Sequence, residues 1–147
     1  MPATYVKTGG SFSPVLQPYI KSSGSWVPVL NIWVRNGGSW SLAFTGFTAS
    51  AAPNPADGTA LSSTVDSVFC TATPTGGVGP FTYAWAYVSG DATISIVSPT
   101  SSTTVFRATG MAVGEIRSAV FSCVVTDTTT GISETTNNVS TTLENIS

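Results

Sequence analysis

Residues 118–126 have the sequence Ser118-Ala-Val-Phe-Ser-Cys-Val-Val-Thr126, a β-branched and aromatic run whose side chains alternate along the chain. A period of two predicts a β-strand with one face in a core. Similar short runs lie at residues 67–72, 81–88, 92–97, 103–108 and 138–143, with glycine and proline turns between them. Short strands at this spacing, without sustained helical periodicity, predict an all-β sandwich over residues 60–147.

The order Cys70, Trp85, Cys123 resembles the immunoglobulin core, in which two cysteines on facing sheets pack against a tryptophan. Phe121 stands two residues before the second cysteine, where true immunoglobulin domains place the tyrosine of the tyrosine corner. This departure indicates an immunoglobulin-like or PKD-like domain rather than an antibody-type one. The resemblance implies a structural core role for Cys70, Trp85, Phe121 and Cys123.

The two cysteines could form one disulfide or remain buried thiols. They lack C-x-x-C spacing and are too few to hold a metal alone. Met1 is followed by neither a basic nor an apolar stretch, so we expect no signal peptide and take the thiol form as the default.

The composition excludes several classes of function. Only 8% of the 147 residues are charged and there is no histidine, which removes Ser-His-Asp, Cys-His and His-metal chemistry. A net charge of −2 with five cations predicts no nucleic-acid binding, and the short apolar runs predict no membrane insertion. The seven acids are scattered in turn-like contexts, so we expect neither an enzyme nor a cofactor. A carboxylate pair brought together by the fold, or calcium at Asp91 or Asp127, is the weaker alternative.

Residues 5–46 contain three copies of a fourteen-residue repeat, which begin at Tyr5, Tyr19 and Trp33. The copies align without a gap, and they share a cation, a small-residue turn and a second aromatic. The aligned positions are Lys7, Lys21 and Arg35; Gly10, Gly24 and Gly38; and Phe12, Trp26 and Trp40.

Each repeat predicts a β-hairpin, because glycine accepts the positive φ that a tight turn needs. A two-residue turn sets Lys7 opposite Phe12, Lys21 opposite Trp26 and Arg35 opposite Trp40. We therefore predict a hairpin element at residues 1–46 and a linker at 47–59, where prolines and Asp57-Gly58 indicate a loop. Residues 1–56 hold three cations and no acid, a charge of +3, while residues 57–147 hold two cations and seven acids, a charge of −5.

The repeats contain many aromatic residues for their length, and a segment this short seldom folds stably without a disulfide, a metal or a partner. A surface of this kind usually meets a partner, so we expect a docking or oligomerisation element. A small self-contained β core is the alternative. The expected interface residues are Tyr5, Lys7, Phe12, Tyr19, Lys21, Trp26, Trp33, Arg35 and Trp40.

Taken as a whole, the chain resembles virion proteins of tailed bacteriophages. Residues 79–91, 98–106 and 119–127 resemble immunoglobulin-like domains appended to phage structural proteins, and the Tyr-Val-Lys-x-Gly-Gly-Ser-Trp pattern is similar to repeats of tail and baseplate-associated proteins. The resemblance implies a non-enzymatic structural or adaptor protein of the tail or capsid, assembled into the virion in the host cytoplasm. Its partners would be other virion proteins and copies of itself, with the sandwich projecting outward.

The alternative function is adhesion to host-surface glycans. Exposed aromatic rings can stack on sugars, and sandwiches commonly present ligands at their loops. The candidate residues are the loops 76–80 and 89–91, together with Tyr87.

Overall fold

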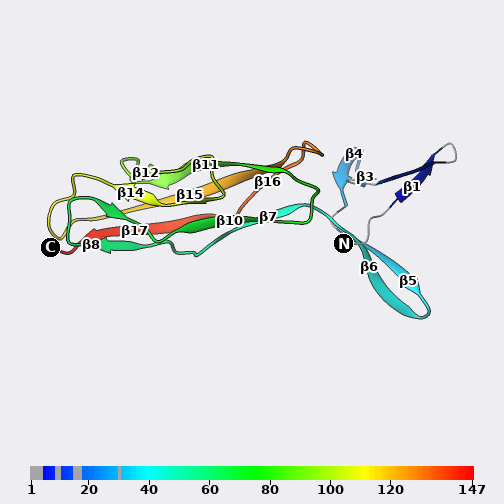
Figure 1. The fold of residues 1–147 in the computed structure, drawn as a ribbon, viewed down its shortest axis with the longest axis horizontal. Coiled ribbons are helices and arrows are strands. Elements are labelled where there is room, and N and C mark those ends of the chain that lie inside the picture. The colour runs from blue at the N-terminus through cyan, green and yellow to red at the C-terminus, as the bar shows by residue number, and fades with distance from the viewer. Residues whose placement is uncertain (1–4, 9–10, 15–17, 30) are drawn as a thin grey trace.

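The computed structural model describes residues 5–8, 11–14, 18–29 and 31–147. This part of the chain is all-β, as predicted, and contains no helix. Figure 1 shows an elongated sandwich with three hairpins beyond one end and the C-terminus at the other.

One layer of the sandwich is built around a long central strand, β15 (Ile116–Asp127). The strand order is β11-β15-β17-β8, and β16 pairs with another part of β15. All pairs are antiparallel except the one between β8 and β17. The other strands of this layer are β8 (Gly58–Ala60), β11 (Phe81–Gly90), β16 (Ser133–Thr135) and β17 (Val139–Asn145).

The facing layer consists of two small sheets with the orders β13-β10-β7 and β12-β14-β9. Their strands are β7 (Thr48–Ala52), β9 (Val65–Asp66), β10 (Cys70–Thr75), β12 (Ser95–Ile96), β13 (Thr103–Thr104) and β14 (Phe106–Ala108).

Aromatic contacts join the two layers. Phe106 on β14 stacks on Phe121 of β15 with the ring centroids 4.1 Å apart, and it meets Trp85 of β11 edge-on at 5.8 Å. Trp85 lies opposite Cys123 in the register of β11 and β15, and its indole Nε1 donates to the Ser101 carbonyl at 2.9 Å. The C-terminal part of the chain is an immunoglobulin-like β-sandwich.

The four residues expected in the core, Cys70, Trp85, Phe121 and Cys123, are all buried. Both cysteines are free thiols in the structure. Burial, helped by the neighbouring Cys123, raises the pKa of Cys70 to about 11, and burial also raises the pKa of Cys123. Thiols with raised pKa values are poor nucleophiles, so both cysteines act as small apolar core residues.

The linker expected at residues 47–59 is instead part of the sandwich. Phe47 is buried and stacks on Phe81, with the ring centroids 5.5 Å apart, and β7 pairs with β10. Ala51 and Ala56 are also in the core. Residues 48–56 contain alanines rather than large apolar side chains, and they also contain two prolines. Both features weaken the sequence signal for a strand, so the pattern did not predict β7.

A substitution at Gly58 tests whether residues 47–59 are packed in the sandwich. An added Cβ would clash with the Asp66 carbonyl oxygen and approach the Ser67 Cα to 2.9 Å. Gly58→Ala should therefore lower the free energy of unfolding by about 1–3 kcal/mol through overpacking. Urea denaturation of the full chain measures this, with the exposed neighbour Thr59→Ala as the control. A glycine in a free linker would accept alanine without any change in stability.

The three N-terminal hairpins have the predicted register. Lys7 pairs with Phe12, Lys21 with Trp26 and Arg35 with Trp40. Each hairpin is a separate two-stranded sheet. The strands are β1 (Tyr5–Thr8) and β2 (Ser11–Pro14), β3 (Tyr19–Ser22) and β4 (Ser25–Pro28), and β5 (Asn31–Asn36) and β6 (Ser39–Thr45).

Two-residue turns with positive φ close the second and third hairpins. The φ values are 49° and 89° at Ser23 and Gly24, and 57° and 89° at Gly37 and Gly38. Positive φ at both turn residues is the pattern that matches the twist of the flanking strands. The turn predicted at residues 9–10 lies outside the described residues.

Candidate interaction surface

The hairpin register places an aromatic, a cation and a second aromatic on one face of each hairpin. Alternate residues of a strand share a face, and residues directly opposite on the partner strand share it too. Tyr19, Lys21 and Trp26 therefore lie on one side of the second hairpin. The same positions of the third hairpin hold Trp33, Arg35 and Trp40. We call these the aromatic faces.

The first hairpin repeats this arrangement in its backbone register. Tyr5, Lys7 and Phe12 occupy the equivalent pairing positions, while their side chains lie outside the described part of the structure. The nine residues singled out from the sequence thus fall at three equivalent positions per hairpin. Their role as an interface stays a prediction.

The aromatic side chains of Tyr19, Trp26, Trp33 and Trp40 are open to solvent. Trp26 is 69% exposed, Trp40 64% and Trp33 54%. In the second hairpin every residue from 19 to 27 is exposed, on both faces. A lone two-stranded hairpin is marginally stable in water. In the described part of the chain, residues 19–27 of the second hairpin therefore have no buried face.

The cations of the hairpins and those of the sandwich have different surroundings. Arg107 makes a bidentate ion pair with Asp66, at 2.6 and 2.7 Å, and hydrogen bonding from Arg107 lowers the pKa of this carboxyl. Arg117 pairs with Glu115 at 2.6 Å. Lys21 and Arg35, in contrast, are exposed in a segment that contains no acidic residue. An acidic partner surface would complement the hairpins.

The loops considered for glycan binding do not form one site. Loop 76–80 precedes β11, whereas residues 89 and 90 are the last two residues of that strand, so residues 81–88 separate the two candidates. A strand segment of that length spans roughly 26 Å. Tyr87 is half-exposed, and its hydroxyl donates to the Gly90 carbonyl at 2.7 Å. Tyr87 and residues 89–91 therefore form one surface feature, and loop 76–80 is a separate one.

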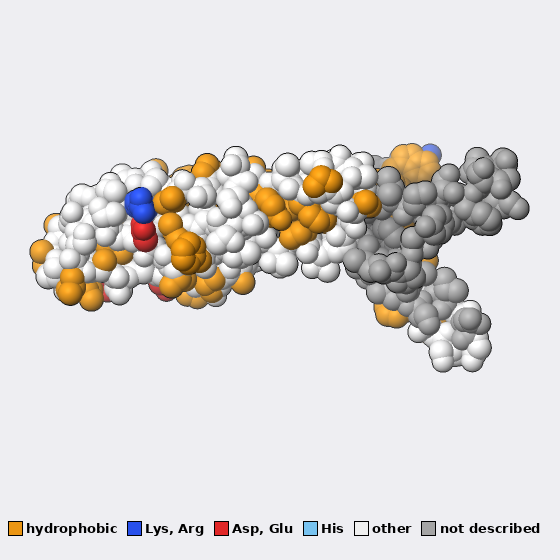
Figure 2. All heavy atoms as spheres, viewed as in Figure 1, with side chains coloured by type: hydrophobic (Ala, Val, Ile, Leu, Met, Phe, Trp, Pro, Cys, Tyr) orange, Lys and Arg blue, Asp and Glu red, His pale blue; other side chains and the backbone are white. Residues whose placement is uncertain are grey.

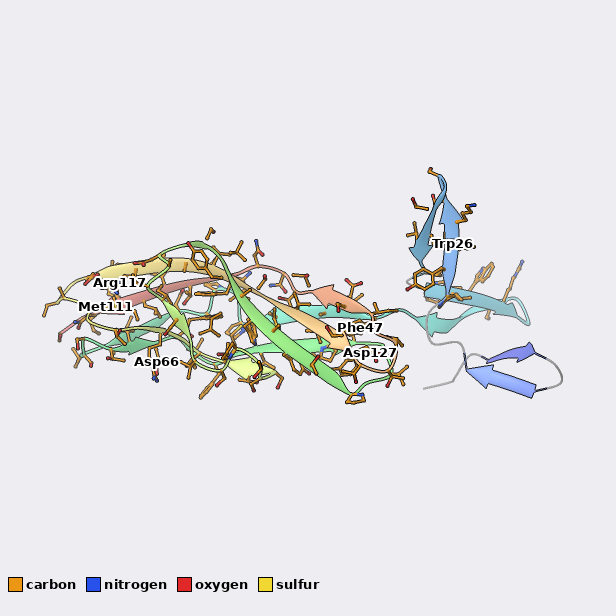
Figure 3. All side chains as sticks on the ribbon, turned by 90° about the horizontal axis from the view of Figure 1, so that it is seen from above. Trp26, Phe47, Asp66, Met111, Arg117 and Asp127 are labelled. Carbon is orange, nitrogen blue, oxygen red and sulfur yellow. The ribbon has the colours of Figure 1, made fainter. Side chains whose placement is uncertain are left out.

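Asp127 is a buried carboxylate that anchors loop 76–80, a role that we did not predict. Its Oδ2 accepts a hydrogen bond from the Val78 amide at 2.6 Å, and its Oδ1 accepts from the amides of Thr129 and Thr130 at 2.9 and 3.2 Å. Figure 3 shows Asp127 and Phe47 at the end of the sandwich nearest the hairpins. The run Asp127-Thr-Thr-Thr-Gly131 carries a turn signal that could have indicated this cap.

Burial alone would raise the pKa of Asp127, but hydrogen bonds from the amides of Val78, Thr130, Thr129 and Gly79 outweigh it and lower the pKa below 3.8. A lowered folded-state pKa stabilises the protein above the ordinary value, and this stabilisation is lost as the pH falls through the folded-state pKa. Asp127→Asn should cost about 1–3 kcal/mol at pH 7, because the Val78 amide loses its acceptor.

The difference in stability between the wild type and Asp127→Asn should shrink as the pH falls below 3.8. Denaturation at a series of pH values measures this difference. The other carboxylates with lowered pKa values are common to both proteins, so their contributions cancel. A difference that is constant down to the lowest pH would contradict the role assigned to Asp127.

One shallow groove of about 400 Å³ lies along β8 and β9 and is lined by Asp57, Gly58, Thr59, Asp66, Ser67 and Val68. Both of its carboxylates have structural partners. Asp57 accepts from the Thr142 amide at 2.8 Å, and Asp66 holds Arg107. Within the described ranges, no three His, Cys, Asp or Glu side chains are placed to hold a metal ion. The same ranges include no helix that is long and apolar enough to cross a membrane.

By its strand order and its core, the chain is an immunoglobulin-like β-sandwich preceded by hairpins. No protein-family model matches it, and no curated protein matches it. Among solved structures it is similar to the PKD domain (329-428) from human KIAA0319, with 17% sequence identity. The similarity covers 67% of this chain and 80% of that one, with a TM-score of 0.44.

Proposed function

We propose that the chain is a non-enzymatic structural or adaptor protein of a tailed-phage virion. The hairpins dock it into a symmetric assembly, and the sandwich projects outward from the docking point. One observation carries the docking role: the second hairpin, residues 19–27, is exposed on both faces and carries Tyr19 and Trp26.

The repeat itself supports a symmetric or multi-site partner. Three copies of one aromatic face, spaced by fourteen residues, offer three equivalent contacts that bind in the same chemical way. Contacts that are linked on one chain strengthen one another, because the later ones form at a high effective concentration. Weak individual hairpins can therefore give stable attachment.

The sandwich supports a passive role. Its two arginines form ion pairs with carboxylates of the same domain. The two carboxylates of its groove accept hydrogen bonds from the Thr142 amide and from Arg107. Such groups stabilise the domain and are already satisfied within it. The tailed-phage context comes from the sequence resemblance described above.

The test is the composition of purified particles. The protein should co-purify with particles of its phage at a fixed copy number set by their symmetry, measured by quantitative mass spectrometry. Particles washed in high salt should keep it, because the aromatic faces supply most of the contact. Absence from purified particles, or a copy number that varies between preparations, would reject the proposal.

A further inference from the structure

The end of the sandwich farthest from the hairpins presents an apolar surface of its own. Four large aliphatic side chains are exposed there: Leu61 (75%), Val113 (72%), Ile116 (58%) and Ile146 (52%). We call these four residues the distal tip. Figure 2 shows several separate apolar side chains at this end, and Figure 1 places it beside the C-terminus.

Hydrogen bonds between three separate segments shape the distal tip. The Met111 amide donates to the Ser63 carbonyl at 2.9 Å, and the Ile146 amide donates to the Ala60 carbonyl at 2.9 Å. The buried Asn145 joins them, because its side-chain amide donates to the Met111 carbonyl at 3.1 Å. A preformed surface loses little conformational entropy on binding. These hydrogen bonds therefore hold the backbone of the distal tip in place before any partner binds.

An acidic residue lies within this surface. Glu144 on β17 is directly opposite Ile116 on β15 and Thr59 on β8, so these side chains share the outer face of the sheet. In the described part of the chain, the ion pairs of the sandwich involve Asp66, Asp91 and Glu115 but not Glu144. The aliphatic side chains of the distal tip thus lie beside Glu144, an acid for which the described residues provide no ion-pair partner.

The two ends of the chain are complementary in chemistry. The hairpins expose aromatic rings beside Lys21 and Arg35, and the tip exposes aliphatic side chains beside Glu144. Contacts between like ends would bring cation to cation or acid to acid, which costs free energy. Contact between unlike ends would pair the charges and cover both apolar surfaces.

We propose that the distal tip receives the aromatic faces of a second copy of this chain, so that copies associate head to tail. This inference rests on the docking role proposed for the hairpins and names one of their partners. A contact between different surfaces of identical chains gives a ring or an open series. A first copy anchored by its hairpins would then project its sandwich outward and present a tip to the next copy.

Two full-length variants, each defective at one end, test the proposal. The hairpin variant is Trp26→Ser/Trp40→Ser, and the tip variant is Leu61→Ser/Ile146→Ser. All four side chains are exposed, so both variants should melt like the wild type. Light scattering after gel filtration should show wild-type species that grow with concentration, while each variant alone stays monomeric.

The decisive sample is an equimolar mixture of the two variants. The mixture retains one intact hairpin set and one intact tip, so it should form a 1:1 dimer and nothing larger. Glu144→Lys should weaken assembly several-fold, and adding Lys21→Glu/Arg35→Glu in the same chain should restore it, because each contact then regains opposite charges.

Three results would overturn the proposal: a wild-type chain that is monomeric up to its solubility limit, a tip variant that still assembles, or a variant mixture that stays monomeric. Particle binding separates this failure from failure of the proposed function. If the tip variant binds particles and the hairpin variant does not, the hairpins dock on another virion protein. If both bind equally, the docking role itself is wrong.

Discussion

Replacing Trp85 by alanine should lower the free energy of unfolding by about 3–5 kcal/mol, enough to unfold a marginally stable sandwich. Trp85 is 5% exposed, and its ring meets Phe106 edge-on between the two layers. Its indole Nε1 also holds the Ser101 carbonyl, so the substitution leaves both a cavity and an unpaired acceptor. Guanidinium denaturation of the full chain, followed by far-UV circular dichroism, measures the loss.

Trp26→Ala is the matched control for Trp85→Ala. The residue type and the substitution are the same, but the Trp26 side chain is largely exposed on a hairpin. The sandwich should therefore unfold at the wild-type denaturant concentration in Trp26→Ala. Equal denaturation midpoints for the wild type and Trp85→Ala would contradict the role of Trp85 at the centre of the core.

The hairpin variant Trp26→Ser/Trp40→Ser should lose attachment to particles while keeping the stability of the sandwich. Both side chains are largely exposed in the free chain, so their loss should not destabilise the fold. Each buries a large aromatic surface only when a partner covers it, and aromatic anchors of this kind dominate interface energetics. We expect at least a hundredfold loss of affinity, since the two anchors each contribute on the order of 2 kcal/mol.

The control for the hairpin variant removes exposed apolar side chains from the sandwich instead. Phe69→Ser/Val97→Ser removes two exposed apolar side chains that lie outside the hairpins, with Phe69 74% and Val97 43% exposed. This control should bind particles like the wild type. Sedimentation of purified particles with each labelled protein measures both. Equal binding by the hairpin variant and the wild type would contradict the docking role.

Local patterns made the hairpins predictable in detail. A two-residue turn fixes which residues stand opposite each other, so the positions of Gly24 and Gly38 were enough to derive the pairing of Lys21 with Trp26 and of Arg35 with Trp40. The sandwich was predictable as a class because β15 carries a clear alternation that buries Phe121, Cys123 and Val125 on one face.

Other features depend on long-range packing that no local pattern encodes. Strand β7 is built from small residues, and it is held by β10 and by the stacking of Phe47 on Phe81. Asp127 reaches Val78, which is forty-nine positions away in the chain. The distal tip joins residues from three segments, and only folding brings Ile146 to Ala60, the residue before Leu61. These relations required the three-dimensional structure.

The central claim is that the hairpins become buried when the chain is docked, whereas the sandwich is already complete. Hydrogen exchange of residues 19–28, compared between the free chain and the chain in purified particles, tests it most directly. We predict fast exchange of these amides in the free chain, strong protection in the particle, and unchanged protection of β15. Fast exchange of residues 19–28 in both states would contradict the account.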